Sequence, residues 1–444
     1  MCRRRIMRDS LTPRLRWATG IAVGLDGYNL TVVTASLIAL TRQFHLSDFA
    51  TIELALGTLF GSLLGGILAG TLTDHVGRLK VFTYDLWFFI LFSLTSALSP
   101  SFGILLVSRI FLGFAIGADY AIAPAYVAEF SPSKNRGFQL GFIWLMWPIG
   151  TTLSFVLSGI IFSVVPPLIA WRIVFALAAL PAAVGIWLRK SLPESPRWLI
   201  AMGQEDQGHQ LIDTYQLEPV NYSYPDPHTT SFRQSFVNRW ILILGTWFFL
   251  TMASYGMGLI LPVMLTRSGL TGQMGAIWGT ALVNVGGIVG SFMAMWHLDR
   301  IGCKSLQIVG FGIASLMLGL VAALTAASHV APFVIILLLT IGETMSMYGP
   351  GTVTGIYPAE LFPTHRRATA LGVATAVSRL GAIAGALLFG LINQQGGLSP
   401  VAGVAALIML GGSLLTWIFG TETRQRSLED LNAPSGVFDR SEML

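Results

Sequence analysis

Long apolar runs alternate with short polar breaks along the whole of this 444-residue chain. Each run has about 20 residues, the length that an α-helix needs to cross the hydrocarbon core of a bilayer. The runs are too long for barrel strands and lack their alternation of polar and apolar residues. We therefore predict an all-α membrane protein with twelve transmembrane helices, near residues 17–40, 51–72, 81–99, 103–128, 137–163, 171–189, 240–265, 274–296, 305–327, 331–357, 368–393 and 399–420.

Composition and charge agree with this prediction. The chain is 53% hydrophobic and only 11% charged, whereas a soluble domain carries about 25% charged residues. Its basic residues form no single patch of the kind that binds nucleic acid, so we expect no nucleic-acid partner. They gather instead in alternate breaks, including both termini and the longest break, which places those segments in the cytoplasm.

Three polar segments of the first half recur at matching points of the second half. The pairs are AEFSPSKNRG (128–137) with AELFPTHRRA (359–368), GTLTDHVGRLK (70–80) with HLDRIGCKS (297–305), and PESPR (193–197) with TETR (421–424). Such a parallel repeat with a long central loop is the layout of a transporter whose halves rock against each other. The predicted parts are an N-terminal tail (1–16), a six-helix bundle (17–189), a central loop (190–238), a second six-helix bundle (239–420) and a C-terminal tail (421–444).

These motifs resemble the major facilitator superfamily and, within it, the sugar-porter branch and its metabolite:proton symporter relatives. The resemblance covers about residues 15–424 and rests on GTLTDHVGRLK, PESPRWL, YPAELFPTHRRA and the segment from Arg109 to Arg136. It implies two parallel six-helix bundles, transport by alternating access, no enzymatic activity, and a place in the inner membrane with both termini cytoplasmic. Relatives in this branch carry sugars, organic acids, nicotinate or phosphate.

The first predicted helix departs from the sugar-porter pattern. Sugar porters place an acid after the Gly-Tyr of this helix, where the present chain has Asn29. Aromatic-acid symporters show the pattern D-G-x-D, and here only its first acid is present, as Asp26-Gly27-Tyr28-Asn29. The seventh helix also lacks the paired glutamines of sugar porters. These departures move the expectation away from a sugar substrate.

Three ionisable residues are predicted near the bilayer midplane. Helix rise places Asp26, Glu343 and Arg379 about 14–18 Å into their spans, where charged groups are costly and usually functional. A carboxylate in such a cavity can hold a proton near neutral pH, so we assign proton coupling to Asp26, with Arg109 and Glu343. The sequence leaves open whether Asp26 faces Arg109 or Arg379, and whether such a pair is only structural. We expect Asp119 to have a structural role near the inner gate.

The substrate prediction follows from the midplane arginine. A guanidinium offers a planar fork of donors that matches a carboxylate or phosphate. We therefore predict a proton-coupled symporter of a small organic carboxylate, for example an aromatic acid. The substrate-binding residues would be Arg379, Tyr28, Asn29, Trp147, Tyr255 and Asn284. Alternatives are an exporter of organic cations that uses Asp26 and Glu343 as counter-charges, a sugar or phosphate symporter, and a non-transporting membrane sensor.

Charged residues at the cytoplasmic ends of the predicted helices form a candidate gate. Short loops of alternating charge can lock two halves together and release them in each cycle. The predicted gate residues are Asp74, Gly77, Arg78, Glu129, Arg136, Glu194, Arg197, Asp299, Glu360 and Arg367.

Small residues predict two further features of the helices. Glycines spaced four apart, such as Gly61 with Gly65 and Gly381 with Gly385, allow close helix packing. The run Gly349-Pro350-Gly351 should break or bend the tenth helix, because proline removes a backbone donor.

The sequence indicates no prosthetic chemistry. The two cysteines are far apart, the seven histidines are scattered, and no nucleotide-binding loop is present. We expect no cofactor and no metal. The expected partners are a small-molecule substrate, protons and the lipid bilayer, and we expect a monomer.

Overall fold

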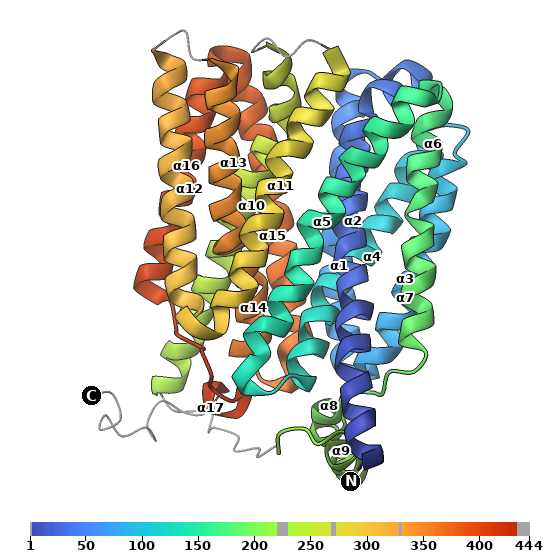
Figure 1. Ribbon diagram of the computed structural model, residues 1–444, viewed down its shortest axis with the longest axis vertical. Helices are drawn as coiled ribbons and strands as arrows, with labels where there is room; N and C mark the ends of the chain where they lie inside the picture. Colours follow the sequence, from blue (N-terminus) through green and yellow to red (C-terminus); the bar gives the residue numbers. More distant parts are fainter. Residues whose placement is uncertain (1, 220–229, 268–271, 328–330, 433–444) are drawn as a thin grey trace.

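The computed structural model describes residues 2–219, 230–267, 272–327 and 331–432. Parts of the central loop and of the C-terminal tail therefore lie outside the described residues. Within them, every regular element is helical, and twelve segments are long and apolar enough to cross a membrane. The predicted number of spans is confirmed (Figure 1).

The first half of the chain supplies six spans. Its helices are α1 (Cys2–Phe44), α2 (Asp48–Val76), α3 (Arg78–Ala97), α4 (Phe102–Phe130), α5 (Arg136–Val164), α6 (Pro167–Leu177) and α7 (Ala179–Arg189). The sixth span consists of α6 and α7 together. α1 begins well before residue 17, where the first span was predicted, so most of the expected N-terminal tail is helical.

The second half repeats this arrangement. Its helices are α10 (Thr230–Arg267), α11 (Gly272–Ile301), α12 (Cys303–Ala326), α13 (Pro332–Tyr348), α14 (Pro350–Leu361), α15 (Arg367–Gly396) and α16 (Leu398–Phe419). The tenth span is broken between α13 and α14, which confirms the predicted break. Gly349 forms the joint with φ −107° and ψ −92°, and the ring of Pro350 starts the next helix.

Short helices cluster at one end of the bundle. α8 (Pro196–Ala201), α9 (Glu205–Tyr215) and α17 (Leu428–Asn432) lie at the end where α1 begins, which is the lower end in Figure 1. Two 3-10 turns, η1 (Ser133–Asn135) and η2 (Thr364–Arg366), lead into α5 and α15. The breaks that hold most of the basic residues therefore meet at one end, which we call the lower end.

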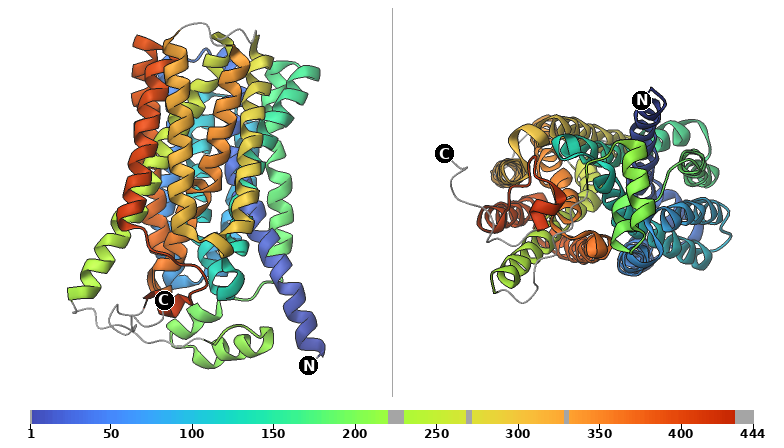
Figure 2. Two further views of the ribbon diagram at one scale, coloured as in Figure 1. Left: turned by 60° about the vertical axis from the view of Figure 1, so that its left-hand side comes forward. Right: turned by 90° about the horizontal axis from the view of Figure 1, so that it is seen from below.

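The two halves stand side by side (Figure 2), and the largest contacts between them are made by two helix pairs. α2 packs along α15, and α5 packs along α11. At the first of these contacts, a Cβ added to Gly372 would lie 2.0 Å from the backbone oxygen of Gly66. Only glycine permits this approach of two backbones across the interface.

Glycines also set the packing within each half. A Cβ on Gly61 would lie 1.9 Å from the carbonyl oxygen of Ile110, and one on Gly385 would lie 2.0 Å from that of Met252. α2 therefore lies against α4, and α15 against α10, at backbone contact distance. The packing role that was predicted for these glycines is confirmed.

Candidate transport pathway and gate

A cavity of about 200 Å³ lies between the two halves. The α1 residues in its wall, Leu30 to Thr34, follow Asp26 along a helix that rises from the lower end. The cavity thus lies between mid-depth and the upper end. It is smaller than pockets for drug-sized ligands, which have about 300–1,000 Å³, and it suits a small metabolite. Its walls are mainly apolar, with polar groups from Thr31, Thr34, Thr58, Thr151, Ser254, Tyr255, Thr280, Asn284, Glu343 and Ser346.

Four of the predicted site residues line this cavity: Trp147, Tyr255, Asn284 and Glu343. The indole N–H of Trp147 has no acceptor among the described residues, so it is free to donate to a ligand. The side-chain nitrogen of Asn284 donates to the carbonyl of Thr280 at 2.8 Å. No lysine, arginine or aspartate is part of the described lining, so Glu343 is its only carboxyl group.

Arg379 lies directly behind the cavity wall. Its Nη1 donates to the hydroxyl of Tyr255 at 3.1 Å, and its Nε donates to Ser62 of the other half at 2.8 Å. The guanidinium also lies 4.6 Å from the ring centroid of Tyr120, a favourable cation–π distance. Its Nη2 has no hydrogen-bond partner, and Arg379 forms no ion pair with any residue that the structure describes.

Asp26 is fully buried on α1, and neither carboxyl oxygen has a hydrogen-bond partner in the described part of the chain. It is close enough to Arg379 to feel its charge, but no ion pair joins it to Arg379 or to Arg109. The sequence had left open which arginine pairs with Asp26, and the structure pairs it with neither. An ionised carboxylate without a partner is costly to bury, so this geometry favours a protonated Asp26.

The other predicted residues of α1 and α4 join helices and do not line the cavity. Arg109 donates to the backbone oxygen of Asn29 and, at 3.4 Å, to the hydroxyl of Thr58. The side chain of Asn29 donates to the carbonyl of Leu25 at 3.0 Å. The hydroxyl of Tyr28 donates to a carbonyl of α6 at 2.6 Å. In this conformation these groups connect α1 with α2, α4 and α6.

Aromatic side chains close the pathway beneath the cavity. Trp144 of α5 packs edge-on against Trp247 of α10 and Tyr120 of α4, with centroid distances of 6.2 and 5.4 Å. Trp144 also lies against Gly355 of α14, where an added Cβ would come within 1.9 Å of the indole ring. Because α5 belongs to one half and α10 and α14 to the other, this cluster bridges the halves.

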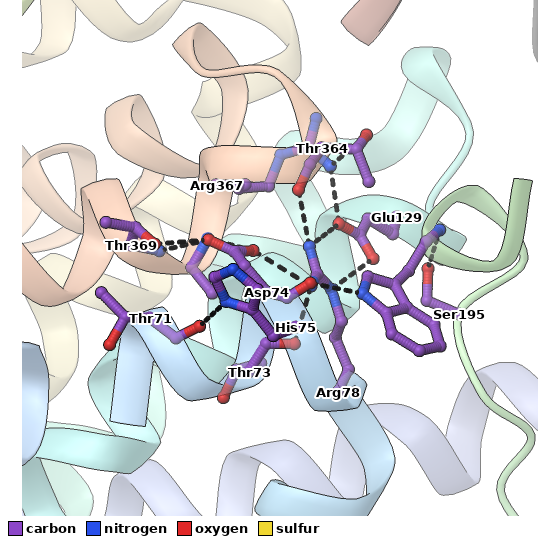
Figure 3. A network of polar contacts seen from close by, with 12 residues as sticks. Thr71, Thr73, Asp74, His75, Arg78, Glu129, Ser195, Thr364, Arg367 and Thr369 are labelled. Carbon is purple, nitrogen blue, oxygen red and sulfur yellow. Dashed lines mark hydrogen bonds and ion pairs between the residues drawn. The ribbon is translucent and has the colours of Figure 1, made fainter. Parts of the chain in front are cut away.

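A network of charged groups closes the lower end (Figure 3). Arg78 is fully buried and pairs with Asp74 at 3.0 Å and with Glu129 at 3.1 Å. Glu129 also accepts from Arg367 of the other half at 2.9 Å. Asp74 accepts from the backbone N–H and the hydroxyl of Thr369, at 2.8 and 2.7 Å. Asp74 therefore caps the first turn of α15, where a helix favours negative charge.

The second half makes the equivalent contact with the first half. Asp299, at the end of α11, accepts from the backbone N–H groups of Gly137 and Phe138 in the first turn of α5, both at 2.9 Å. Arg136 at the start of α5 pairs with Glu360 of α14 at 2.6 Å. Each half thus places a carboxylate on a helix N-terminus of the other half. The internal repeat of the sequence thus appears as two equivalent sets of contacts between the halves, with pseudo-two-fold symmetry.

The central loop adds contacts to the charged network around Arg78 in the first half. Glu194 accepts from the backbone N–H of Arg78 at 3.0 Å and from that of Ser195 at 2.8 Å. Burial raises the pKa of the Glu194 carboxyl above its usual range, and these N–H donors oppose the rise. Arg197 binds Glu429 of the C-terminal segment. Gly77 has φ +114°, a conformation that favours glycine and allows the sharp turn from α2 to α3.

The structure thus places all ten predicted gate residues at the lower end. Sequence reasoning missed two acids. Glu422 accepts from the backbone N–H of Cys303 at 3.0 Å, as Glu194 does from Arg78. Asp85 pairs with Arg189 at 2.6 Å inside the first half. An acid within the predicted third span was the available signal for Asp85.

Comparison with known proteins agrees with this architecture. The family described as sugar (and other) transporter matches residues 29–434. A metabolite transport protein of Escherichia coli, YaaU, is 30% identical over 93% of this chain and 93% of its own length. The niacin transporter NiaP of Acinetobacter baylyi is 25% identical over 94% of this chain and 95% of its own length.

A solved structure shares the fold. The proton:xylose symporter XylE, bound to 6-bromo-6-deoxy-D-glucose, superposes with a TM-score of 0.81 at 21% sequence identity, over 96% of this chain and 99% of that one. Together with the twelve spans and the repeated motifs, these matches show that the chain is a multi-pass membrane protein that belongs to the sugar (and other) transporter family of the major facilitator superfamily.

Proposed function

We propose that this protein is a proton-coupled symporter of a small organic carboxylate that works by alternating access in the inner membrane. In this proposal the lower end, with both termini, faces the cytoplasm, as the bias of basic residues favours. The observation that carries the proposal is the buried Arg379, whose charge has no carboxylate partner among the described residues.

The environment of Arg379 is suited to an anionic ligand. A buried charge without a counter-ion is costly, and an anion that binds beside it removes part of this cost. The guanidinium contacts Tyr255 of the cavity wall through Nη1 and keeps Nη2 without a partner among the described residues, so a shift of the Tyr255 side chain would open the guanidinium to the cavity. Trp147 supplies a second free donor on the cavity wall. A relative named as a niacin transporter also supports a substrate that carries a carboxylate.

The position of Asp26 gives a physical reason for symport. When Asp26 is ionised, it neutralises part of the field of Arg379 and competes with an anionic substrate. When Asp26 binds a proton, the cation is left uncompensated and attracts the substrate more strongly. Proton binding and substrate binding therefore favour each other, and by linkage the effect is reciprocal. Each would load from the upper side while the lower end is locked.

A neutral, hydroxylated metabolite is the second candidate substrate. The described cavity wall holds Glu343, Asn284 and several hydroxyl groups but no cation. Such groups exchange hydrogen bonds with sugar or polyol hydroxyls without any need for Arg379. The two candidates therefore differ in their dependence on this arginine.

Ligand-induced stabilisation of the purified protein separates the candidates. Thermal unfolding would be measured at two pH values with nicotinate, benzoate, xylose, myo-inositol, phosphate and a quaternary amine. A ligand that binds only the folded state raises its stability by RT ln(1 + [L]/Kd). We expect carboxylates to stabilise the wild type, and Arg379→Ala and Arg379→Lys to lose this effect, because lysine lacks the bidentate fork.

Asp26→Asn and a remote arginine complete this test. Asp26→Asn should bind carboxylates with little pH dependence, since the competing charge is gone. Arg172→Ala removes an arginine that donates to the carbonyls of Ala97 and Ser99, far from the cavity wall, and should behave like the wild type. Stabilisation by xylose or myo-inositol that survives Arg379→Ala would establish the second candidate. Stabilisation by the amine alone would refute both.

A further inference from the structure

Three carboxyl groups are buried in the first half, and two of them share one arginine. Asp26 on α1, Asp85 on α3 and Asp119 on α4 are 0, 5 and 0% exposed, and Arg189 at the end of α7 is 1% exposed. Asp85 and Asp119 both pair with this single base, so their two carboxylates would leave one negative charge in excess in a low-dielectric interior. Such an excess is removed most cheaply when carboxyl groups bind protons.

Asp85 and Asp119 are both joined to Arg189. Nη1 of Arg189 lies 2.6 Å from Oδ1 of Asp85, and Nη2 lies 3.6 Å from Oδ1 of Asp119. One guanidinium thus faces two carboxyl groups, and no other ion pair reaches either of them in the described part of the chain. Two ionised carboxylates on one cation would leave a buried negative charge in excess, and a like charge nearby disfavours the ionised form of one of them. The pair therefore holds one proton and one negative charge, which Arg189 balances.

The three carboxyl groups and Arg189 lie at successive depths, from the middle of the bundle to its lower end. Asp26 sits near the middle of the first span, where the charged groups that act on it most are Asp119 and Arg379. Asp119 lies about three turns before the lower end of α4, and Asp85 about two turns from the lower end of α3. Arg189 is the last residue of α7 at the lower end. The charge of this arginine also acts on the hydroxyl of Tyr126 of α4.

This line of groups is separate from the substrate pathway. It runs inside the first bundle, between α1, α3, α4 and α7, and none of its members lines the central cavity. The gate network and the cluster around Trp144 lie instead at the interface of the halves. A proton route along these groups would therefore bypass the closed gate.

We infer that the Asp85–Asp119 pair, held by Arg189, is a second proton-binding site through which the proton of Asp26 leaves toward the lower end. This inference rests on the proposed proton coupling. Asp26 gives its proton to Asp119, and the pair then releases the proton of Asp85 to water at the lower end. One proton enters and one leaves, so the pair returns to one proton and one negative charge.

A purely structural ion network would be built differently. No hydrogen-bond donor among the described residues reaches the second oxygen of Asp85 or either oxygen of Asp119, and Nε and Nη2 of Arg189 also lack hydrogen-bond partners. A buried network that serves stability alone gains by satisfying every group. A proton-transfer site requires polar atoms that are free to accept or donate a hydrogen bond next to the proton that moves.

Infrared spectroscopy of the purified protein tests the shared proton without any substrate. At neutral pH, the C=O stretch of a protonated carboxyl group should be present in the wild type. It should lose intensity in Asp85→Asn and in Asp119→Asn, and it should be unchanged in Asp213→Asn, an exposed acid of α9. An unchanged band in both buried variants would show that the pair holds no proton and would overturn the inference.

Transport in proteoliposomes tests the route, with nicotinate and benzoate as probes. Two rates are compared: accumulation driven by a pH gradient, and counterflow, which exchanges substrate without net proton movement. For Asp85→Asn and Asp119→Asn we expect accumulation to fall at least 10-fold and counterflow to stay within about 2-fold of the wild type. Asp119→Glu, which keeps a carboxyl group, should restore part of the accumulation.

The remaining outcomes also decide the question. Full accumulation in both Asn variants would overturn the route and leave the proposed function intact. Loss of counterflow together with accumulation would mean that the cluster only holds the fold. If the wild type accumulates neither probe under a pH gradient, the proposed function and the route both fail, while the infrared result still decides whether the pair holds a proton.

Discussion

The carboxylate of Asp74, at the end of α2, accepts hydrogen bonds from both the backbone N–H and the hydroxyl of Thr369, in the first turn of α15. This contact joins the two halves at the lower end. It does so through a helix N-terminus, where the partial positive charge of the helix adds to the hydrogen bonds. The closed state of the lower end therefore depends on a negative charge at residue 74.

Asp74→Asn should weaken this closed state. The loss of a charged helix cap costs about 0.5–2 kcal/mol, which changes the ratio of closed to open states about 2- to 30-fold. The change can be measured from the upper side by alkylation of Thr34→Cys, which lines the cavity. The background would lack the native cysteines, and labelling by an impermeant reagent should slow in the Asn variant.

Asp299→Asn provides a symmetric check of this prediction. Asp299 caps α5 as Asp74 caps α15, so its replacement should slow the labelling by a similar factor. The exposed Asp213→Asn should have no effect. Faster labelling in Asp74→Asn would mean that the carboxylate opposes the closed state, contrary to its contacts.

The fold and the position of the predicted gate residues at one end could be predicted because their signals are local. An apolar run of sufficient length defines a span, whichever way its helix is turned. The gate motifs recur in both halves, so Asp74 and Asp299 could be recognised as equivalent positions. The break at Gly349 and the close approach at Gly385 follow from the chemistry of proline and glycine.

The partners of the buried charges could not be predicted because they depend on helix rotation. Depth along a helix follows from residue number, but the face on which a side chain lies follows from packing. Asp26 and Arg109 lie on neighbouring helices, and yet Arg109 turns toward Asn29 and Thr58. Arg379 likewise lies behind the cavity wall and not in it.

Two glycines of α15 offer a matched test of the backbone contacts. A Cβ on Gly385 would lie 2.0 Å from the carbonyl oxygen of Met252, whereas one on Gly390 would meet no atom of the described residues within 4 Å. Gly385→Ala should destabilise the protein by about 1–3 kcal/mol, because the helices must move apart. Gly390→Ala should be neutral or slightly stabilising, since alanine favours the helix. Thermal unfolding in detergent would compare them, and equal melting temperatures would contradict the packing.

The contact between Trp144 and Gly355 predicts a coupled pair of substitutions. Gly355→Ala would place a Cβ 1.9 Å from the indole ring, so Trp144 must leave its place beneath the cavity. We expect a loss of about 1–3 kcal/mol in unfolding free energy. Trp144→Phe makes room for the methyl group, so the double variant should recover part of the loss, with a coupling energy of about 0.5–3 kcal/mol. Additive losses of unfolding free energy would show that there is no steric conflict between Trp144 and a side chain at residue 355.

We expect the titration of Glu194, in the central loop, to make the stability of the protein depend on pH. Burial raises the pKa of its carboxyl in the folded protein, despite N–H donors from Arg78, Leu79 and Ser195. A raised folded pKa means that its contribution to stability is complete below the unfolded pKa of about 4.3. That contribution is lost as the pH rises through the folded pKa.

Glu194→Gln isolates this effect, because the amide keeps an oxygen for the N–H donors and does not titrate. The unfolding free energy of the wild type, relative to that of the Gln variant, should therefore fall as the pH rises from about 4 toward neutral. Melting curves of both proteins across that range would measure the difference. If the difference instead grows with pH, the N–H donors outweigh burial. Glu194 would then hold the turn between α2 and α3 as a carboxylate.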